Sequence, residues 1–198
     1  MWESRVPEQY RSMSSTDPNR SPLLTLEPFL DAVREGMESA GWELSGLQKT
    51  TSFEFEGRWA GDSSRSAYLF FHRDGVPEWA SIDVFLDETS RGLKGNLALV
   101  VDGPDLEEMR DPGRILAGLA EVARRHLPPG YRSPITLRYR LGGLDEDPRG
   151  AGSEIRFKLL IPAGAIQSGF SAISSLAQAA ARAFETILQA PEMQPLVS

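Results

Sequence analysis

Apolar residues recur along this chain with two different periods, one typical of helices and one typical of strands. Spacings of three and four residues predict three helices, over 26–40, from 112 to the Pro128-Pro129-Gly130 sequence, and over 170–188. Alternation of apolar and polar residues predicts six strands, over 51–59, 67–72, 79–86, 96–101, 135–141 and 154–161. The resulting order, α-ββββ-α-ββ-α, indicates an α+β fold in which helices pack on an antiparallel sheet.

The residues at the ends of the predicted helices support these assignments. Thr25 is a good N-cap for the first helix, and Gly41 supplies its left-handed stop. Asp111 is placed to cap the second helix, with Pro112 at the first helical position. Ser168 is the expected cap of the last helix.

The predicted strands differ in how many of their faces are apolar. Apolar residues alternate with charged ones over 51–59, which predicts one face in water. Over 67–72 apolar residues stand on both sides, so we expect both faces of that strand to be covered. An Asp-Gly pair predicts a hairpin leading to 79–86, and 87–95 is expected to form a polar turn.

Four basic residues on the last two strands form a candidate partner-binding site. They are Arg138, Arg140, Arg156 and Lys158. If the two strands pair, these residues share one face, where like charges opposite one another disfavour pairing unless an anionic group lies nearby. The anionic groups are either Glu54 and Glu56 of this chain or those of a partner.

The last helix carries unusually little charge. It is rich in alanine and has only Arg182 and Glu185 as charged residues. Such a helix is either packed on both sides within its own fold or contributes to an oligomer interface.

The composition predicts one domain between two tails. The chain has 198 residues, of which 40% are hydrophobic and 25% charged, enough for one globular domain that buries roughly two-thirds of its unfolded surface. Residues 1–22 mix polar residues and proline without an apolar period and are expected to be a mobile tail. Residues 190–198 form a second expected tail, which leaves the domain at 23–189.

Cysteine and long apolar segments are both absent from the sequence. Without cysteine there is no disulfide, thiolate metal site or cysteine nucleophile, and a reducing compartment fits best. The apolar runs fall short of the roughly 18 residues that a membrane span needs. We therefore expect a cytoplasmic protein that does not enter a membrane.

The net charge of −7 is unevenly distributed. Residues 23–111 carry −10, residues 112–158 carry +4, and the two ends together carry −1. Nucleic acid is an unfavourable partner because its binding needs a dominant basic face. A bipolar surface instead suits a charged protein partner or a second copy of the chain.

The sequence contains no recognisable catalytic or metal-binding arrangement. His72 and His126 lie in unlike contexts, and no motif with metal-ligand spacing is present. Asp83, Asp87 and Glu88 are candidates for a carboxylate pair, although two of them are expected in a turn. We expect no catalytic residue, metal or cofactor, and the sequence favours a non-enzymatic role.

The order of the elements resembles the fold of type III secretion chaperones and of the bacterial sensory-transduction-regulator-like proteins that share it. The resemblance covers roughly residues 24–189 and rests on element order, acidity and hydrophobic pattern. It implies a small, cytoplasmic, generally dimeric protein that binds polypeptides without doing chemistry. The chain departs from the pattern in its strand at 96–101, its long N-terminal tail and its greater length.

Three functional hypotheses follow. The leading one is a non-enzymatic protein-binding module, chaperone-like or regulatory, that acts as a homodimer. The alternative is a small-molecule-binding cup between a curved sheet and the last helix. That cup would be lined by Tyr68, Phe70, Trp79 and Phe85. The third is an enzyme built around Asp83, His72 and Arg138, provided that these residues converge.

Overall fold

The structure, a computed structural model, describes residues 25–52, 64–89, 91–102, 112–126, 135–140 and 154–193. The helices in this part are α1 (Leu26–Ser39), α2 (Pro112–His126), α3 (Ala163–Ser168), α4 (Phe170–Leu188) and the 3-10 helix η2 (Pro191–Met193). The strands are β1 (Glu43–Ser52), β2 (Ser64–His72), β3 (Ala80–Thr89), β4 (Gly92–Asp102), β5 (Ile135–Arg140) and β6 (Glu154–Leu160). The fold is α+β, as the sequence predicts.

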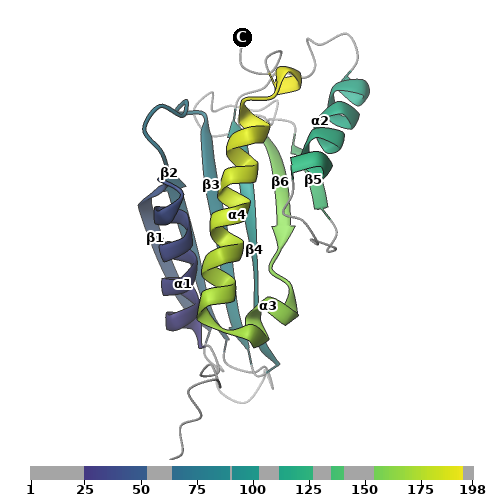
Figure 1. The fold of residues 1–198 in the computed structure, drawn as a ribbon. Coiled ribbons are helices and arrows are strands. Elements are labelled where there is room, and N and C mark those ends of the chain that lie inside the picture. Colours follow the sequence, from purple (N-terminus) through teal and green to yellow (C-terminus); the bar gives the residue numbers. More distant parts are fainter. Residues whose placement is uncertain are drawn as a thin grey trace, which may run out of the picture.

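The strands form one antiparallel sheet in the order β1-β2-β3-β4-β6-β5. The first four strands are a meander, and β6 then pairs with both β4 and β5. Figure 1 shows α1 and α4 in front of the sheet and α2 beside β5, and none of the described helices lies on the opposite face. The described part of the chain therefore has one sheet face covered by helices and one face without them.

The core lies between the helices and the covered face of the sheet. Leu69 and Phe71 of β2 and Ile82 of β3 are fully buried there. Phe29 of α1 and Phe184 of α4 belong to the same cluster and are also fully buried. Each such side chain contributes about 1.5–3 kcal/mol to stability, so this cluster is what holds the two layers together.

Helix α4 is packed by its own chain on both sides and against the sheet. It contacts α1, α2 and β4. At the contact with α1, a Cβ atom added to Gly36 would lie 2.2 Å from the Ser174 carbonyl oxygen and 2.7 Å from Cβ of Ala177. Packing within the fold, the first of our two interpretations, therefore accounts for the scarcity of charge in this helix. None of the described helices, α4 included, is long and apolar enough to cross a membrane.

The start of α1 is capped by a side chain from a distant strand. Thr25 occupies the N-cap position as predicted, but its side chain makes no capping hydrogen bond. The backbone N–H of Leu26 instead donates to Oε2 of Glu88 in β3, at 3.3 Å. A carboxylate suits this place because the first turn of a helix presents unpaired N–H groups and a partial positive charge.

The predicted order of elements is wrong at its end, where two helices rather than one follow β6. Ser168 does not cap the last helix. It is the final residue of α3, and its hydroxyl donates to the Gly164 carbonyl at 2.8 Å, while Gly169 is the N-cap of α4. Gly169 has a φ of 90°, a conformation that glycine adopts without strain, and this residue separates the two helices.

The first strand was predicted too late in the chain. Strand β1 ends at Ser52 and overlaps the predicted 51–59 only in its last two residues, and 53–59 lie outside the described residues. A β-bulge between Leu44 and Gly46 interrupts the alternation of β1. The bulge removes the two-residue period by which a strand over 43–52 could have been predicted.

Two further strand predictions were wrong. Tyr68 and Phe70 of β2 are 40% and 39% exposed, so only one face of that strand is covered. Asp87 and Glu88 do not begin a turn, because β3 extends through both of them.

The packed part of the chain continues further than the predicted domain. Residues 190–193 were assigned to the C-terminal tail, whereas Pro191–Met193 form η2 and Met193 is fully buried. The predicted N-terminal tail at 1–22, the cap Asp111 and residues 194–198 lie outside the described residues.

Candidate binding surface

The candidate site is the sheet face that carries no described helix, which we call the helix-free face. Its members follow from the register, because opposed residues of neighbouring strands point to the same side of a sheet. One row across the sheet contains Phe70, Asp83, Ala98 and Lys158, the next contains Tyr68, Phe85, Asn96 and Leu160, and a third contains Ser81, Val100 and Arg156. The face therefore combines aromatic side chains on β2 and β3 with charged side chains on β3 and β6.

Three side chains form an aromatic patch on this face: Tyr68, Phe70 and Phe85. The rings of Tyr68 and Phe85 are tilted by 44° with centroids 4.8 Å apart, within the favourable range for aromatic pairs. Phe70 lies over Gly46 of β1, where an added Cβ would be 3.2 Å from its Cδ2 atom. Tyr68, Phe70 and Leu160 are three of the four exposed large hydrophobic residues in the described part of the chain. Exposed apolar surface is thus concentrated on this face.

Arg156 of β6 is the centre of a charged cluster beside the aromatic patch. Its Nε and Nη2 donate to the two carboxylate oxygens of Glu154 at 3.0 and 3.3 Å. Its Nη1 lies 3.1 Å from Oδ2 of Asp83 on β3. Because β4 lies between β3 and β6, this contact passes over Ala98 and Val100, which are each only 3% exposed.

The cluster shifts the pKa of both its central groups. Burial raises the pKa of the Asp83 carboxyl, and the Arg156 charge and the Ser81 hydroxyl, which donates to Asp83 at 3.2 Å, only partly offset this. Burial alone would lower the pKa of the Arg156 guanidinium, but its hydrogen bond to Glu154 and the nearby carboxylates raise it. Arg156 therefore stays charged, while Asp83 is held in an environment that penalises its charged form.

The structure brings together some of the four predicted basic residues. Arg156 and Lys158 lie on the helix-free face, and in the register of β5 and β6 Arg138 stands opposite Arg156 and Arg140 opposite Glu154. The anionic groups next to Arg156 are Asp83 and Glu154; Glu54 and Glu56, which the sequence suggested, lie outside the described residues.

Lys158 differs from Arg156 in its surroundings. No carboxylate of the described residues forms an ion pair with Lys158, which is partly exposed. Among the described side chains of this face, Lys158 is therefore a basic residue that is open to an outside partner.

The aromatic patch has a second charged pair on its other side. Asp87 accepts a hydrogen bond from the Ser66 hydroxyl at 2.7 Å and lies 3.0 Å from Nζ of Lys94. Asp87 is only 7% exposed, and these two contacts compensate its charge within the face. Aromatic surface is thus bordered by internally neutralised charges at both ends.

The residues considered for catalysis do not form one site. Asp83 and Asp87 lie on the helix-free face on either side of Phe85, whereas Glu88 contacts the start of α1. His72 stands opposite Glu43 at the end of β2, and Arg138 is three strands away from Asp83. The described residues contain no group of three or more metal-ligating side chains.

The residues considered for a small-molecule cup are split between the two faces. Tyr68, Phe70 and Phe85 lie on the helix-free face, away from α4. Trp79 is partly buried against the core. These four residues therefore do not line a common space between α4 and the sheet.

A shallow pocket of about 470 Å³ lies elsewhere, where α1 turns into β1. Its lining residues are Arg34, Glu38, Gly41, Trp42, Glu43 and Leu44. No sequence pattern predicts this pocket, because it arises from a strand that begins earlier than expected.

Comparisons with family models, with curated proteins and with solved structures give no match to this chain.

Proposed function

We propose that this chain is a non-enzymatic protein-binding module, chaperone-like or regulatory, that acts in the cytoplasm as a homodimer. We further propose that the helix-free face is the surface on which two copies meet. The observation that carries the proposal is the aromatic patch beside the compensated cluster around Arg156.

The exposed apolar surface supports an interface at this place. The exposed parts of Tyr68, Phe70 and Leu160 amount to roughly 250 Å² per copy, which is comparable to the largest apolar patch on many soluble proteins, a patch that often serves in binding. Aromatic residues are also the side chains that most often dominate the energy of protein interfaces.

A stable dimer commonly buries about 800 Å² per copy, so the charged part of the face must be covered as well. Burying a charge is costly unless it is already paired and hydrogen bonded. Arg156 meets this condition through Asp83 and Glu154, and Asp87 meets it through Ser66 and Lys94. The face can therefore be covered without isolating these charges.

The mixed charge of the face favours a second copy over a strongly charged partner. Acidic and basic side chains are mixed on it, so a second copy related by a two-fold axis presents groups of both signs to it. The element order that resembles the type III secretion chaperone fold, whose members are generally dimeric, is consistent with this proposal. The small-molecule cup receives less support, because its aromatic residues lie on the face away from α4.

Light scattering coupled to size-exclusion chromatography tests the proposal. We expect twice the mass of one chain at tens of micromolar, and a shift toward the monomer for Leu160→Asp and for Phe85→Asp. Thr186→Asp, on the exposed outer side of α4, is the control and should remain dimeric. A monomeric wild-type protein, or a dimer unaffected by both face variants, would overturn the proposal.

A further inference from the structure

The outer edge of β1 is open in the described part of the chain. β1 is the first strand in the sheet order, so no described strand pairs with its outer side. An edge strand directs the N–H and C=O groups of every second residue outward, and these groups can pair with another extended segment. Most described side chains of β1 are exposed, and Leu47 is 44% exposed.

The bulge in β1 places two leucines on the same side of this edge. Leu44 stands opposite Phe71, whereas Leu47 stands opposite Leu69, two residues earlier in β2. Leu44 and Leu47 are three residues apart and would face opposite sides of a regular strand. Because the bulge adds one residue, both face α1 and form an apolar floor beside the open edge.

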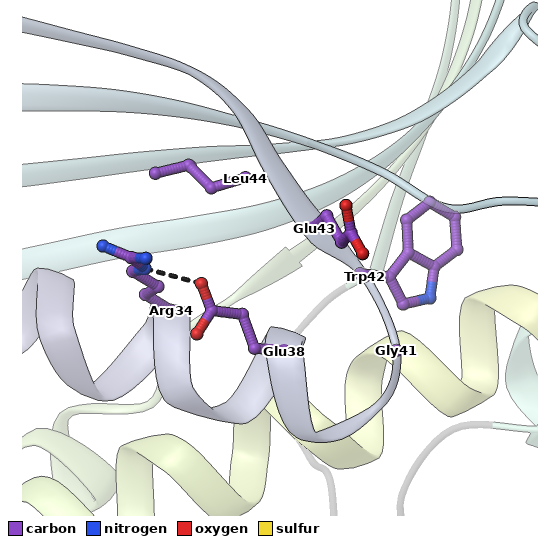
Figure 2. A pocket seen from close by; sticks show the side chains of 6 residues that line it. All are labelled: Arg34, Glu38, Gly41, Trp42, Glu43 and Leu44. Atoms are coloured by element: carbon purple, nitrogen blue, oxygen red, sulfur yellow. Dashed lines mark hydrogen bonds and ion pairs between the residues drawn. The ribbon is translucent and has the colours of Figure 1, made fainter.

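The pocket at the turn from α1 to β1 lies next to this floor. Figure 2 shows Arg34 and Glu38 of α1 on one side of the pocket and Leu44 and Glu43 of β1 on the other. Arg34 is held by Glu38, with 2.6 Å between Nε and Oε1. A strand added to the edge of β1 would therefore direct alternate side chains into this pocket, in the arrangement used by domains that bind peptides between a helix and an edge strand.

The groove between α1 and β1 has an acidic excess. Glu27, Asp31, Arg34 and Glu38 follow one another at helical spacing along the side of α1 that faces β1. Asp31 and Glu43 form no ion pair with any described residue, whereas Glu38 is paired with Arg34. These two carboxylates favour a positively charged occupant.

Surface ion pairs link α1 to the sheet near Lys49. Oε1 of Glu27 in α1 lies 3.6 Å from Nζ of Lys49 and 3.7 Å from Nη1 of Arg65. These contacts join α1 to the sheet beyond Leu47. The part of the edge that lies beside both the pocket and the two leucines is Glu43–Leu47.

We propose that an extended, positively charged segment of a partner protein binds as an added strand along Glu43–Leu47. On the α1 side of the sheet its apolar side chains lie on Leu44 and Leu47, and one basic side chain lies at Asp31. A second basic side chain, on the opposite face of the added strand, lies at Glu43, which stands opposite His72. This inference rests on the proposed role in protein binding but not on the homodimer, because Leu44 and Leu47 lie on the α1 side of the sheet and Tyr68 and Phe85 on the other.

The test uses the full chain and a short synthetic peptide of valine and lysine residues that carries a lysine on each face of the extended strand, with a matched peptide in which glutamate replaces lysine. We expect the lysine peptide to slow amide hydrogen exchange in residues 43–47 and the glutamate peptide to have no effect. Asp31→Lys with Glu43→Lys should weaken binding by about tenfold or more, because two attractive contacts become repulsive. Leu47→Asp should weaken it as well.

Glu35→Lys is the control for Asp31→Lys, because both substitutions make the same change of charge on α1, but Glu35 contacts Ser174 of α4. It should alter binding by less than about twofold. The inference would be overturned if the two peptides bound equally, or if the protection from hydrogen exchange lay outside β1. Equal effects of the control and the double variant, or pairing of β1 with a second copy of itself, would overturn it as well. The same titration on Leu160→Asp separates this result from a failure of the homodimer proposal.

Discussion

Arg156 of β6 reaches over β4 to Asp83 of β3, with 3.1 Å between Nη1 and Oδ2. The contact covers Ala98 and Val100 and joins two strands that share no backbone pairing. It explains why small apolar residues of β4 are shielded from water on a sheet face without a described helix. Four predictions follow from this and other contacts.

The first prediction concerns pH. Burial raises the folded-state pKa of Asp83 above the ordinary value of 3.8, so between these two values the folded chain keeps a proton that the unfolded chain has released. In that window stability falls as pH rises. Asp83→Asn cannot ionise, so its free energy of unfolding relative to wild type should rise from about pH 3.8 upward and level off above the raised pKa. Urea unfolding across pH measures this, and a difference that falls with pH would show that the Arg156 charge outweighs burial.

The second prediction concerns the cost of removing the cation. Arg156→Met leaves the part-buried carboxylates of Asp83 and Glu154 without their shared partner. We expect the free energy of unfolding to fall by about 1–3 kcal/mol. Arg124→Met is the matched control, because its pair with Glu121 is exposed and should cost less than about 0.5 kcal/mol. Chemical denaturation measures both, and equal losses would contradict a structural role for the cluster.

The third prediction uses two helical glycines. Gly36→Ala should destabilise the protein by about 1–3 kcal/mol, because the added Cβ meets α4 at 2.2 Å and forces the two helices apart. Gly118→Ala in α2 should instead stabilise it by about 0.5–1 kcal/mol, since the nearest atom would be 3.8 Å away and alanine is the better helix former. Thermal unfolding of both variants measures the two changes, and the same sign for both would refute the packing of α1 on α4.

The fourth prediction concerns the start of α1. Glu88→Ala removes the acceptor for the Leu26 N–H and the partner of Arg65, and it should cost about 1 kcal/mol. Thr25→Ala should cost much less, although threonine is the residue that the sequence designates as the cap, because its side chain makes no capping bond. Chemical denaturation of the two variants shows whether Glu88 or Thr25 contributes more to the start of α1. A larger loss for Thr25→Ala would show that the local cap governs the helix.

Much of the fold could be predicted from local patterns. The helices α1 and α4 and the strands β5 and β6 begin and end close to their predicted positions, because each has several apolar residues at its own period. β2, β3 and β4 were placed correctly but extend three or four residues further, into segments predicted as turns. β1 escaped prediction because its bulge places Leu44 and Leu47 three residues apart, which is neither the period of a strand nor a full helical pattern.

The site could not be predicted in the same way. Whether Tyr68 and Phe70 are covered depends on which face the helices occupy, and the spacing within β2 carries no information about that. The contact of Arg156 with Asp83 depends on β6 lying beside β4, an arrangement set by pairing between segments distant in the sequence. The sequence identified Arg156 and Lys158 as candidates, but only the register shows what surrounds them.

Isotope-filtered NOE measurements on a mixture of labelled and unlabelled copies test the central claim most directly. If two copies meet through the helix-free face, the rings of Tyr68 and Phe85 will show contacts with protons of the other copy, among them the methyl groups of Leu160. Intermolecular contacts confined to α1 and α4, or none at concentrations of tens of micromolar, would contradict the account.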